Sequence, residues 1–143
     1  MIKFKLIDNR TKVSKQIAEL KDKLEIIPKE FLKETVTEIV LESPVDTGTY
    51  MDSHNVGVVG AMASSKGKPR HQNYQDHADK ALERMFAQID ALPESTTKHF
   101  IANNSEHAWK VEYEFGYAPY TTARAKAQQI LDRVIARVMR GSQ

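Results

Sequence analysis

Histidine is the residue type in this sequence best suited to bind a metal ion or to transfer protons. The five histidines, His54, His71, His77, His99 and His107, are scattered singly along the chain. A zinc site needs three or four ligands in a tightly defined geometry, and no H-E-x-x-H pattern supplies part of one. The sequence therefore favours surface positions or hydrogen-bonded core positions for these side chains, and it predicts no metal site and no cofactor.

Two carboxylates, Asp46 and Glu114, could act as an acid–base pair of the kind that hydrolases use. A turn explains Asp46 without catalysis, because an Asp side chain can accept hydrogen bonds from backbone amides just downstream. The sequence also lacks the G-x-x-x-x-G-K-[ST] loop, the G-x-G-x-x-G loop and the G-x-S-x-G elbow. We therefore expect a protein that is not an enzyme, with a hydrolase built on this pair as a weaker alternative.

Basic side chains form two groups that could meet phosphates. The first group is in the loop at residues 64–72 (SSKGKPRHQ), which carries Lys66, Lys68 and Arg70. The second group is on the last predicted helix, where Arg124, Lys126, Arg133, Arg137 and Arg140 are opposed only by Asp132. A formal net charge of +2 does not indicate nucleic acid by itself. A solvated face is the favoured interpretation, and a small nucleic-acid-binding protein using both groups is the alternative function.

Aromatic residues are concentrated between Trp109 and Tyr120, in the sequence WKVEYEFGYAPY. This density exceeds what a surface loop needs. The rings either pack in the core or anchor a protein interface, where aromatic residues are enriched.

A long helical pattern comes before all of these residues, from about residue 12 to residue 42. Its apolar positions recur at steps of three and four, which is the spacing of one helical face. They are Val13, Ile17, Leu20, Leu24, Ile27 and Phe31, followed by Leu32, Val36, Ile39 and Val40. The pattern predicts that this stripe lies in the core. Pro28 lacks a backbone donor, so we expect either a kinked helix or two helices.

The stretch SPVDTGTY that begins at Ser43 should end this helix and reverse the chain. The residues expected to form the turn are Pro44, Asp46, Thr47 and Gly48. Strands are predicted at residues 54–62 and 96–102, with a turn at Asn103-Asn104, and a helix at residues 74–92 lies between them. A short helix capped by Ser105 and ended by Gly116 should follow, and then a last helix, capped by Thr121 or Thr122, to about Met139.

These elements predict one α+β domain over residues 1–143. A long N-terminal helix, kinked or split at Pro28, should accompany a small antiparallel sheet on which the inserted helix and the C-terminal helix pack. The chain has no cysteine, so neither disulfides nor thiolate metal sites are expected. It also has no apolar run of about 18 residues and no signal-peptide pattern. We therefore expect a soluble protein that is made in the cytoplasm and has no membrane partner.

The order and spacing of these elements resemble the tail-completion, or minor tail and neck, proteins of tailed bacteriophages. The resemblance rests on the helix ending in SPVDTG, the strand–helix–strand unit ending in Asn-Asn, and Trp109 followed five residues later by Glu114-Phe115-Gly116. It covers most of the chain, and PVDTG is its most specific element. The sequence differs after Gly116, where YAPYTTAR replaces the Gln-x-Pro-x-Gly loop that is frequent in the family. It also differs after Gly48, where it has Thr49-Tyr50-Met51-Asp52.

The resemblance implies a structural virion protein, made in the host cytoplasm, at the head–tail junction. Its copies are expected to form a ring, a hexamer on family grounds, that contacts the tail-tube protein and a head-completion or connector protein. DNA is expected to pass through the lumen. The residues expected at interfaces or at the lumen are Lys66, Lys68, Arg70, Trp109, Tyr113, Glu114, Phe115, Gly116, Tyr117, Tyr120, Arg124, Arg133 and Arg137.

Overall fold

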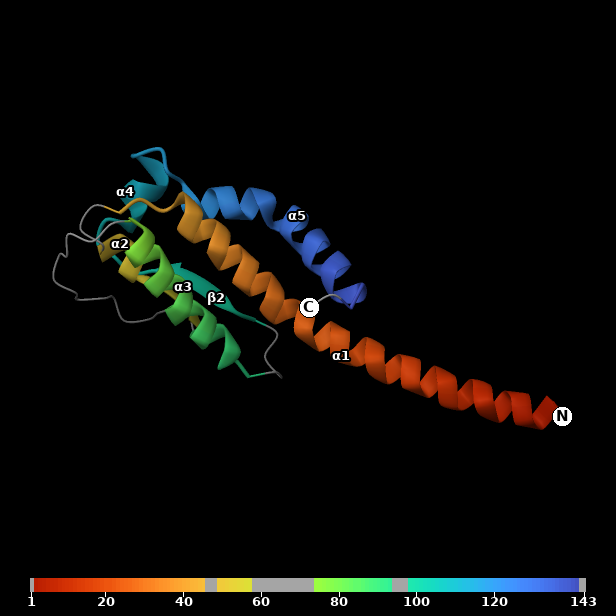
Figure 1. Ribbon diagram of the computed structural model, residues 1–143. Helices are drawn as coiled ribbons and strands as arrows, with labels where there is room; N and C mark the ends of the chain where they lie inside the picture. Colours follow the sequence, from red (N-terminus) through yellow and green to blue (C-terminus); the bar gives the residue numbers. More distant parts are fainter. Residues whose placement is uncertain (1, 46–48, 58–73, 94–97, 142–143) are drawn as a thin grey trace.

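The computed structural model describes residues 2–45, 49–57, 74–93 and 98–141 of the 143-residue chain, with side chains from residue 11 onward. The elements are α1 (Ile2–Glu42), α2 (Thr49–Asp52), β1 (His54–Gly57), α3 (Tyr74–Asp90), β2 (Phe100–Asn103), α4 (Ala108–Tyr113) and α5 (Pro119–Met139). Figure 1 shows α3, α4 and α5 gathered around the C-terminal half of α1, while the N-terminal half of α1 projects away from them. The fold is α+β, as the sequence predicts.

The sheet has two antiparallel strands, with His54 opposite Asn103 and Gly57 opposite Phe100. Helix α3 covers the free edge of β1, where Gln88 Oε1 accepts a hydrogen bond from the Val56 amide at 2.7 Å. Arg84 donates to the His54 carbonyl oxygen at 2.9 Å. These side chains satisfy backbone groups that an uncovered edge would leave open to pairing with another chain. Asn103, predicted in a turn, is the last residue of β2.

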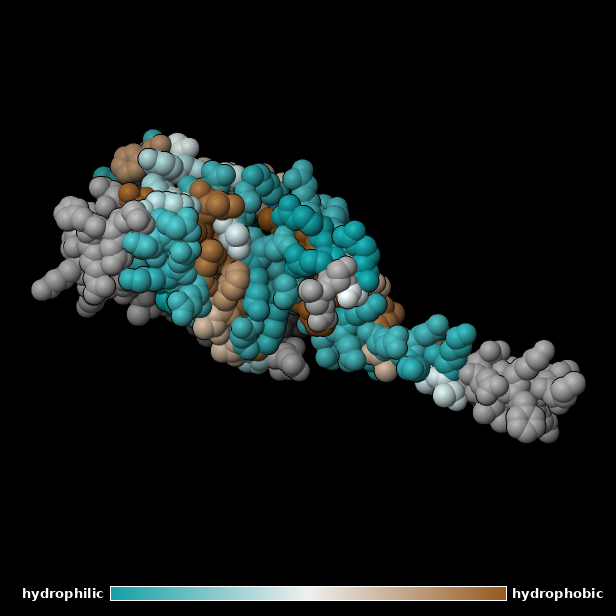
Figure 2. Space-filling model, in the orientation of Figure 1, coloured by the Kyte–Doolittle hydropathy of each residue, from teal (hydrophilic) through white to brown (hydrophobic). Residues whose placement is uncertain are grey.

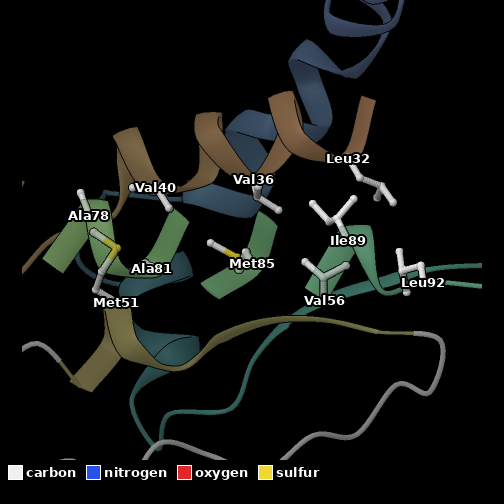
Figure 3. Packing of buried hydrophobic residues seen from close by; sticks show 10 residues of the cluster. All are labelled: Leu32, Val36, Val40, Met51, Val56, Ala78, Ala81, Met85, Ile89 and Leu92. Carbon is white, nitrogen blue, oxygen red and sulfur yellow. The ribbon is translucent and has the colours of Figure 1, made fainter. Parts of the chain in front are cut away.

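The main core lies between α1, α3 and the sheet. Val36 and Val40 of α1 meet Met85 and Ile89 of α3, and each of these side chains is at most 2% exposed. Figure 3 shows the α1 side chains pointing toward α3, with Val56 of β1 on the other side of that helix. The apolar spacing of residues 32–40 thus predicts the buried face of α1 correctly.

A second cluster joins α1 to α5. Ile130, Val134 and Val138 of α5 are buried, and Ile27 and Phe31 of α1 pack against them. The two helices are antiparallel, because Lys126 pairs with Glu38 whereas Arg137 pairs with Glu30. Helix α5 ends at Met139, whose carbonyl oxygen accepts a hydrogen bond from Lys23 Nζ at 3.2 Å.

The prediction that the whole N-terminal stripe is buried is wrong. Val13, Ile17, Leu20 and Leu24 are 50%, 50%, 42% and 53% exposed. Every residue from 11 to 22 is exposed, because α5 ends level with Lys23 and no other described part of the chain covers α1 beyond that point. Residues 2–24 of α1 are called the arm below.

Helix α1 passes through Pro28 as a single element, so of the two forms expected, a kinked helix or two helices, the structure has one helix. Figure 1 shows the helix axis changing direction between the arm and the part that carries α3 and α5. A bend is the expected effect of proline inside a helix, because its ring displaces the preceding turn and one hydrogen bond is lost. Packing of Ile27 and Phe31 on α5 holds the helix together on either side of Pro28.

The start of α5 also differs from the prediction, because neither Thr121 nor Thr122 caps it. Ala118 is the N-cap residue, with a φ of 43°, and Pro119 follows in the first turn. The cap is supplied by Glu112 of α4, whose carboxylate accepts hydrogen bonds from the amides of Tyr120 and Thr121 at 3.2 and 2.6 Å. A carboxylate at a helix N-terminus satisfies open amides and complements the helix dipole.

Two neighbouring positions of α1 provide a direct test of this packing. Ile39 is 1% exposed and Leu41 is 64% exposed. Ile39→Ala should lower the free energy of unfolding by about 2–5 kcal/mol, since it leaves a cavity. Leu41→Ala should change the free energy of unfolding by no more than about 0.5 kcal/mol. Urea unfolding followed by circular dichroism measures both, and equal losses would contradict the described orientation of α1.

Candidate functional site

Four large aromatic side chains are exposed together on α4 and the segment that follows it. Trp109, Tyr113, Phe115 and Tyr117 are 61%, 68%, 57% and 47% exposed. The rings of Trp109 and Tyr113 lie 5.7 Å apart between centroids, at an interplanar angle of 47°. We call this group the aromatic surface. It lies at one end of the molecule, opposite the tip of the arm (Figure 1).

Backbone hydrogen bonds within the segment hold the turn that carries these rings. The amides of Glu114 and Phe115 both donate to the Lys110 carbonyl oxygen, at 2.8 and 2.9 Å. The amide of Ala118 then returns to the Val111 carbonyl oxygen at 3.4 Å, beside the buried Val111 side chain. The exposed rings therefore stand on an ordered turn, which lowers the entropy that binding would cost.

Gly116 makes this turn possible, because its φ of +81° lies in the left-handed region. A Cβ at this position would meet no atom within 4 Å, so only backbone strain opposes a substitution. The predicted helix-ending role of Gly116 agrees with this geometry, since α4 ends at Tyr113 and the chain reverses just after it.

We expect Gly116→Ala to lower the free energy of unfolding by about 1–2 kcal/mol, the usual penalty for an L-residue in this conformation. Ala118→Gly is the matched control, because Ala118 also has a positive φ. There the relief of strain and the greater freedom of the unfolded chain should nearly cancel, leaving a change of less than about 1 kcal/mol. Thermal and urea unfolding of both variants would check this, and a neutral Gly116→Ala would contradict the described turn.

Next to the aromatic surface is a groove of about 570 Å³ between α4, β2 and the start of α5. Trp109 and Tyr113 form one side of it, and Ile39, Ile101 and Tyr120 contribute to the rest. Only two of its fifteen lining residues are charged, namely Glu112 and Arg124. Trp109 and Tyr113 thus belong to both the aromatic surface and this groove, so the two adjoin.

Tyr120 differs from the other aromatic residues predicted at an interface, because its hydroxyl points inward. It donates a hydrogen bond to His54 Nδ1 at 2.8 Å. Burial raises the pKa of this hydroxyl, which keeps it a donor. The Tyr120 hydroxyl thus links α5 to the sheet, while the residue also lines the groove beside Trp109.

His54 is the centre of a buried polar network. Its ring has no exposed surface, and its Nε2 lies 2.9 Å from Ser43 Oγ. Ser43 uses its own proton to bond the Ile39 carbonyl oxygen at 2.6 Å, so Nε2 must be the donor to Ser43. Nδ1 is then an acceptor, and Tyr120 and Asn103 both donate to it, at 2.8 and 3.1 Å. His54 is thus held as one neutral tautomer.

The Ser43–His54 contact has the length of a nucleophile–base hydrogen bond, yet its geometry does not permit catalysis. Ser43 is 3% exposed and donates its proton to the helix backbone rather than to the imidazole. A substrate could not reach either side chain without unfolding the end of α1. The network instead ties α1, β1, β2 and α5 together at one point, and His54 has the hydrogen-bonded core role that the sequence allows for it.

The network should make the protein sensitive to acid. Burial, with the nearby Arg84 guanidinium as the second cause, lowers the pKa of His54 to about 3. The unfolded chain would take up this proton near pH 6.5, so acid favours the unfolded state. The stabilisation is fully present above about pH 6.5 and is lost as the pH falls toward 3, at up to about 1.4 kcal/mol per pH unit.

Urea unfolding between about pH 7.5 and pH 5 would measure this slope. His54→Gln is the control, since it removes the titrating ring and leaves the other histidines in place. We expect a flatter pH dependence in the variant, whatever its absolute stability. Parallel curves for the two proteins would exclude His54 as the source.

The cationic surface predicted on the last helix is largely neutralised. Lys126 pairs with Glu38 at 2.6 Å, Arg133 pairs with Glu34 at 3.1 Å, and Arg137 bridges Glu30 and Glu34. The expectation that only Asp132 opposes these charges is therefore wrong, because sequence periodicity did not reveal that α1 and α5 lie side by side. Arg124, at the groove, is exposed and has no ion pair among the described residues.

Several predicted site residues lie outside the described residues, namely Asp46, Thr47, Gly48, Lys66, Lys68 and Arg70. The proposed acid–base pair therefore has only one described member, the exposed Glu114. Pro44 is described and follows the end of α1, where the Ser43 amide bonds the Val40 carbonyl oxygen at 3.1 Å. Sequence reasoning missed the links from His54 to Ser43, Asn103 and Tyr120.

Within the described ranges, no three His, Asp or Glu side chains are grouped closely enough to hold a metal ion. No helix there combines the length and apolar character needed to cross a membrane. No family model, curated protein or solved structure matches the chain.

Proposed function

We propose that this protein is a structural component of the neck of a tailed bacteriophage, where its copies form a closed ring that completes the tail and joins it to the capsid connector. The tail-tube protein would contact one face of the ring, and a head-completion or connector protein would contact the other. DNA would pass through the ring without being bound at specific bases.

The observation that carries this proposal is the exposure of the aromatic surface. Trp109, Tyr113, Phe115 and Tyr117 are each close to half exposed or more. Large aromatic residues gathered on an ordered surface are typical of the centre of protein interfaces. They stand on the same segment as Glu114-Phe115-Gly116, one of the motifs on which the resemblance to tail-completion proteins rests.

The order of the elements also supports a neck protein. A long helix, a strand, a helix, a second strand, a short helix and a terminal helix follow in the order of the resemblance, with the short helix α2 added between the long helix and the first strand. A structural role also agrees with the burial of Ser43 and His54, the described residues closest to a catalytic geometry.

The ion pairs between α1 and α5 favour this proposal over nucleic-acid binding. Lys126, Arg133 and Arg137 are each engaged by a glutamate of α1. A phosphate would have to displace those carboxylates, so the number of phosphate contacts available to α5 is small. Since DNA affinity and its salt dependence grow with that number, α5 is poorly suited to strong binding.

Light scattering behind a sizing column would test the proposal, on the protein alone and mixed with the candidate tail-tube protein. We expect a closed oligomer, either at once or on mixing, rather than the 16.3 kDa monomer. Phe115→Ser should weaken assembly about tenfold, because it removes an exposed interface ring. Ile135→Ser, at a position of α5 that is 38% exposed, is the matched control and should have little effect.

A chain that stays at 16.3 kDa in both samples, yet is retained by DNA with steep salt dependence, would contradict the proposal. That result would favour the nucleic-acid alternative. The proposal would be supported if the wild-type chain cofractionates with the tail-tube protein, if Phe115→Ser reduces this cofractionation, and if Ile135→Ser leaves it unchanged.

A further inference from the structure

The arm is an amphipathic helix whose apolar face has no partner. Val13, Ile17, Leu20 and Leu24 follow one another at steps of four, three and four residues, so they form a single ridge about 17 Å long. Each of them is at least 42% exposed. A helix in water gains most of its stability by packing such a face against another element. We therefore expect the ridge to be covered by another surface when the protein assembles.

The surface that covers the ridge should be able to pack against a helix. Further along α1, the continuation of the same apolar stripe is already covered by a helix, α5. Ile27 and Phe31 continue the spacing of the ridge and pack on α5. The ridge begins where α5 ends, at the hydrogen bond from Lys23 to the Met139 carbonyl oxygen. Figure 2 shows hydrophobic side chains reaching the surface where the arm leaves the body of the molecule.

The same chain carries a surface of the opposite shape at its other end. The groove beside Trp109 and Tyr113 has a mostly apolar lining. Helix α4, which borders it, lies at the end of the molecule away from the arm (Figure 1). A groove of similar volume at the base of the arm is less suitable, because six of its twelve lining residues are charged, among them the ion-paired Lys33 and Asp90. Helix-in-groove recognition uses apolar anchors at the spacing found in the ridge.

Charge also distinguishes the two surfaces. The part of the arm whose side chains are described, residues 11–24, contains four basic and two acidic residues. The segment at residues 105–118, which carries the aromatic surface, contains three acidic residues and one lysine. Two arms would therefore repel each other, whereas an arm and the aromatic end of another copy attract. Arg124 is the only basic residue that lines the groove.

We propose that the arm of one copy docks, through Val13, Ile17, Leu20 and Leu24, into the groove beside Trp109 and Tyr113 of a second copy. Each copy then donates one arm and accepts another, using two different surfaces at opposite ends of the chain. Such a head-to-tail contact closes into a ring when the rotation between neighbours allows it. The inference deepens the proposed function and rests on it for the closed ring.

The test uses two variants of the full chain that each remove one half of the contact. Ile17→Glu with Leu20→Glu disables the arm, and Trp109→Glu with Tyr113→Glu disables the groove. Lys15→Glu and Lys110→Glu are the controls, since they change the charge by the same two units at exposed positions on the arm and on α4. All substituted side chains are exposed, and circular dichroism would verify that each variant folds.

We expect the wild-type chain and both controls to form oligomers, and each disabled variant to elute as a 16.3 kDa monomer. The decisive sample is the equimolar mixture of the two disabled variants. One intact arm and one intact groove remain in it, so it should yield a dimer and nothing larger.

Other outcomes would overturn the inference. A groove variant that still dimerises alone would mean that arms pair with arms, and a monomeric wild-type chain would mean that another protein covers the ridge. Oligomers that survive both pairs of substitutions would overturn the arm-to-groove contact while leaving the proposed ring intact. The opposite result is also possible: the arm and groove substitutions abolish self-assembly as expected, but the wild-type chain does not bind the tail-tube protein. That result would support this inference and contradict the proposed function.

Discussion

The double packing of α1 is the constraint on which the rest of the structure depends. One face of its C-terminal half, with Val36 and Val40, closes the core against α3 and the sheet, while Ile27 and Phe31 receive α5. Glu30, Glu34 and Glu38 then face the basic side chains of α5. One helix carries both contacts. Helix α1 therefore sets most of the orientation of α5 relative to the unit formed by α3 and the sheet.

Two polar contacts fix what apolar packing leaves undetermined. His54 accepts from Tyr120 and donates to Ser43, so the end of α1, the first strand and the start of α5 meet at one neutral imidazole. Glu112 caps α5 from α4, which sets the position of the short helix that carries Trp109 and Tyr113. The aromatic surface is therefore held by directional hydrogen bonds beneath it, and its own rings remain free to contact another molecule.

Among the described residues, most of the exposed large hydrophobic side chains lie on the arm or on the aromatic surface. The arm presents a ridge, and the aromatic end presents an open groove. A monomer gains nothing from either, because exposed apolar area opposes solubility and an uncovered helix face contributes no packing energy. Assembly would give both surfaces a physical role, and this is the reason for proposing a ring-forming structural protein.

The sequence by itself predicted the long first helix, the strand–helix–strand unit, the short helix α4 and the last helix in their correct order, but it did not predict the short helix α2. The spacing of Val36 and Val40 predicted a buried helix face, Pro44 marked the end of α1, and Gly116 marked the reversal after α4. These features are local, since they depend on side chains a few residues apart and on backbone angles that proline and glycine fix or permit.

Only the tertiary structure decided which faces are covered. The stripe from Val13 to Leu24 has the same spacing as the buried residues after it, and it is exposed because α5 ends beside Lys23. The basic residues of α5 look free in the sequence and are paired because α1 lies alongside them. His54 reads as one of several isolated histidines and becomes the centre of a network through residues up to 66 positions away. The periodicity of a sequence indicates whether one face of a helix is apolar or charged. Which element packs against that face depends on where elements distant in the sequence lie and end.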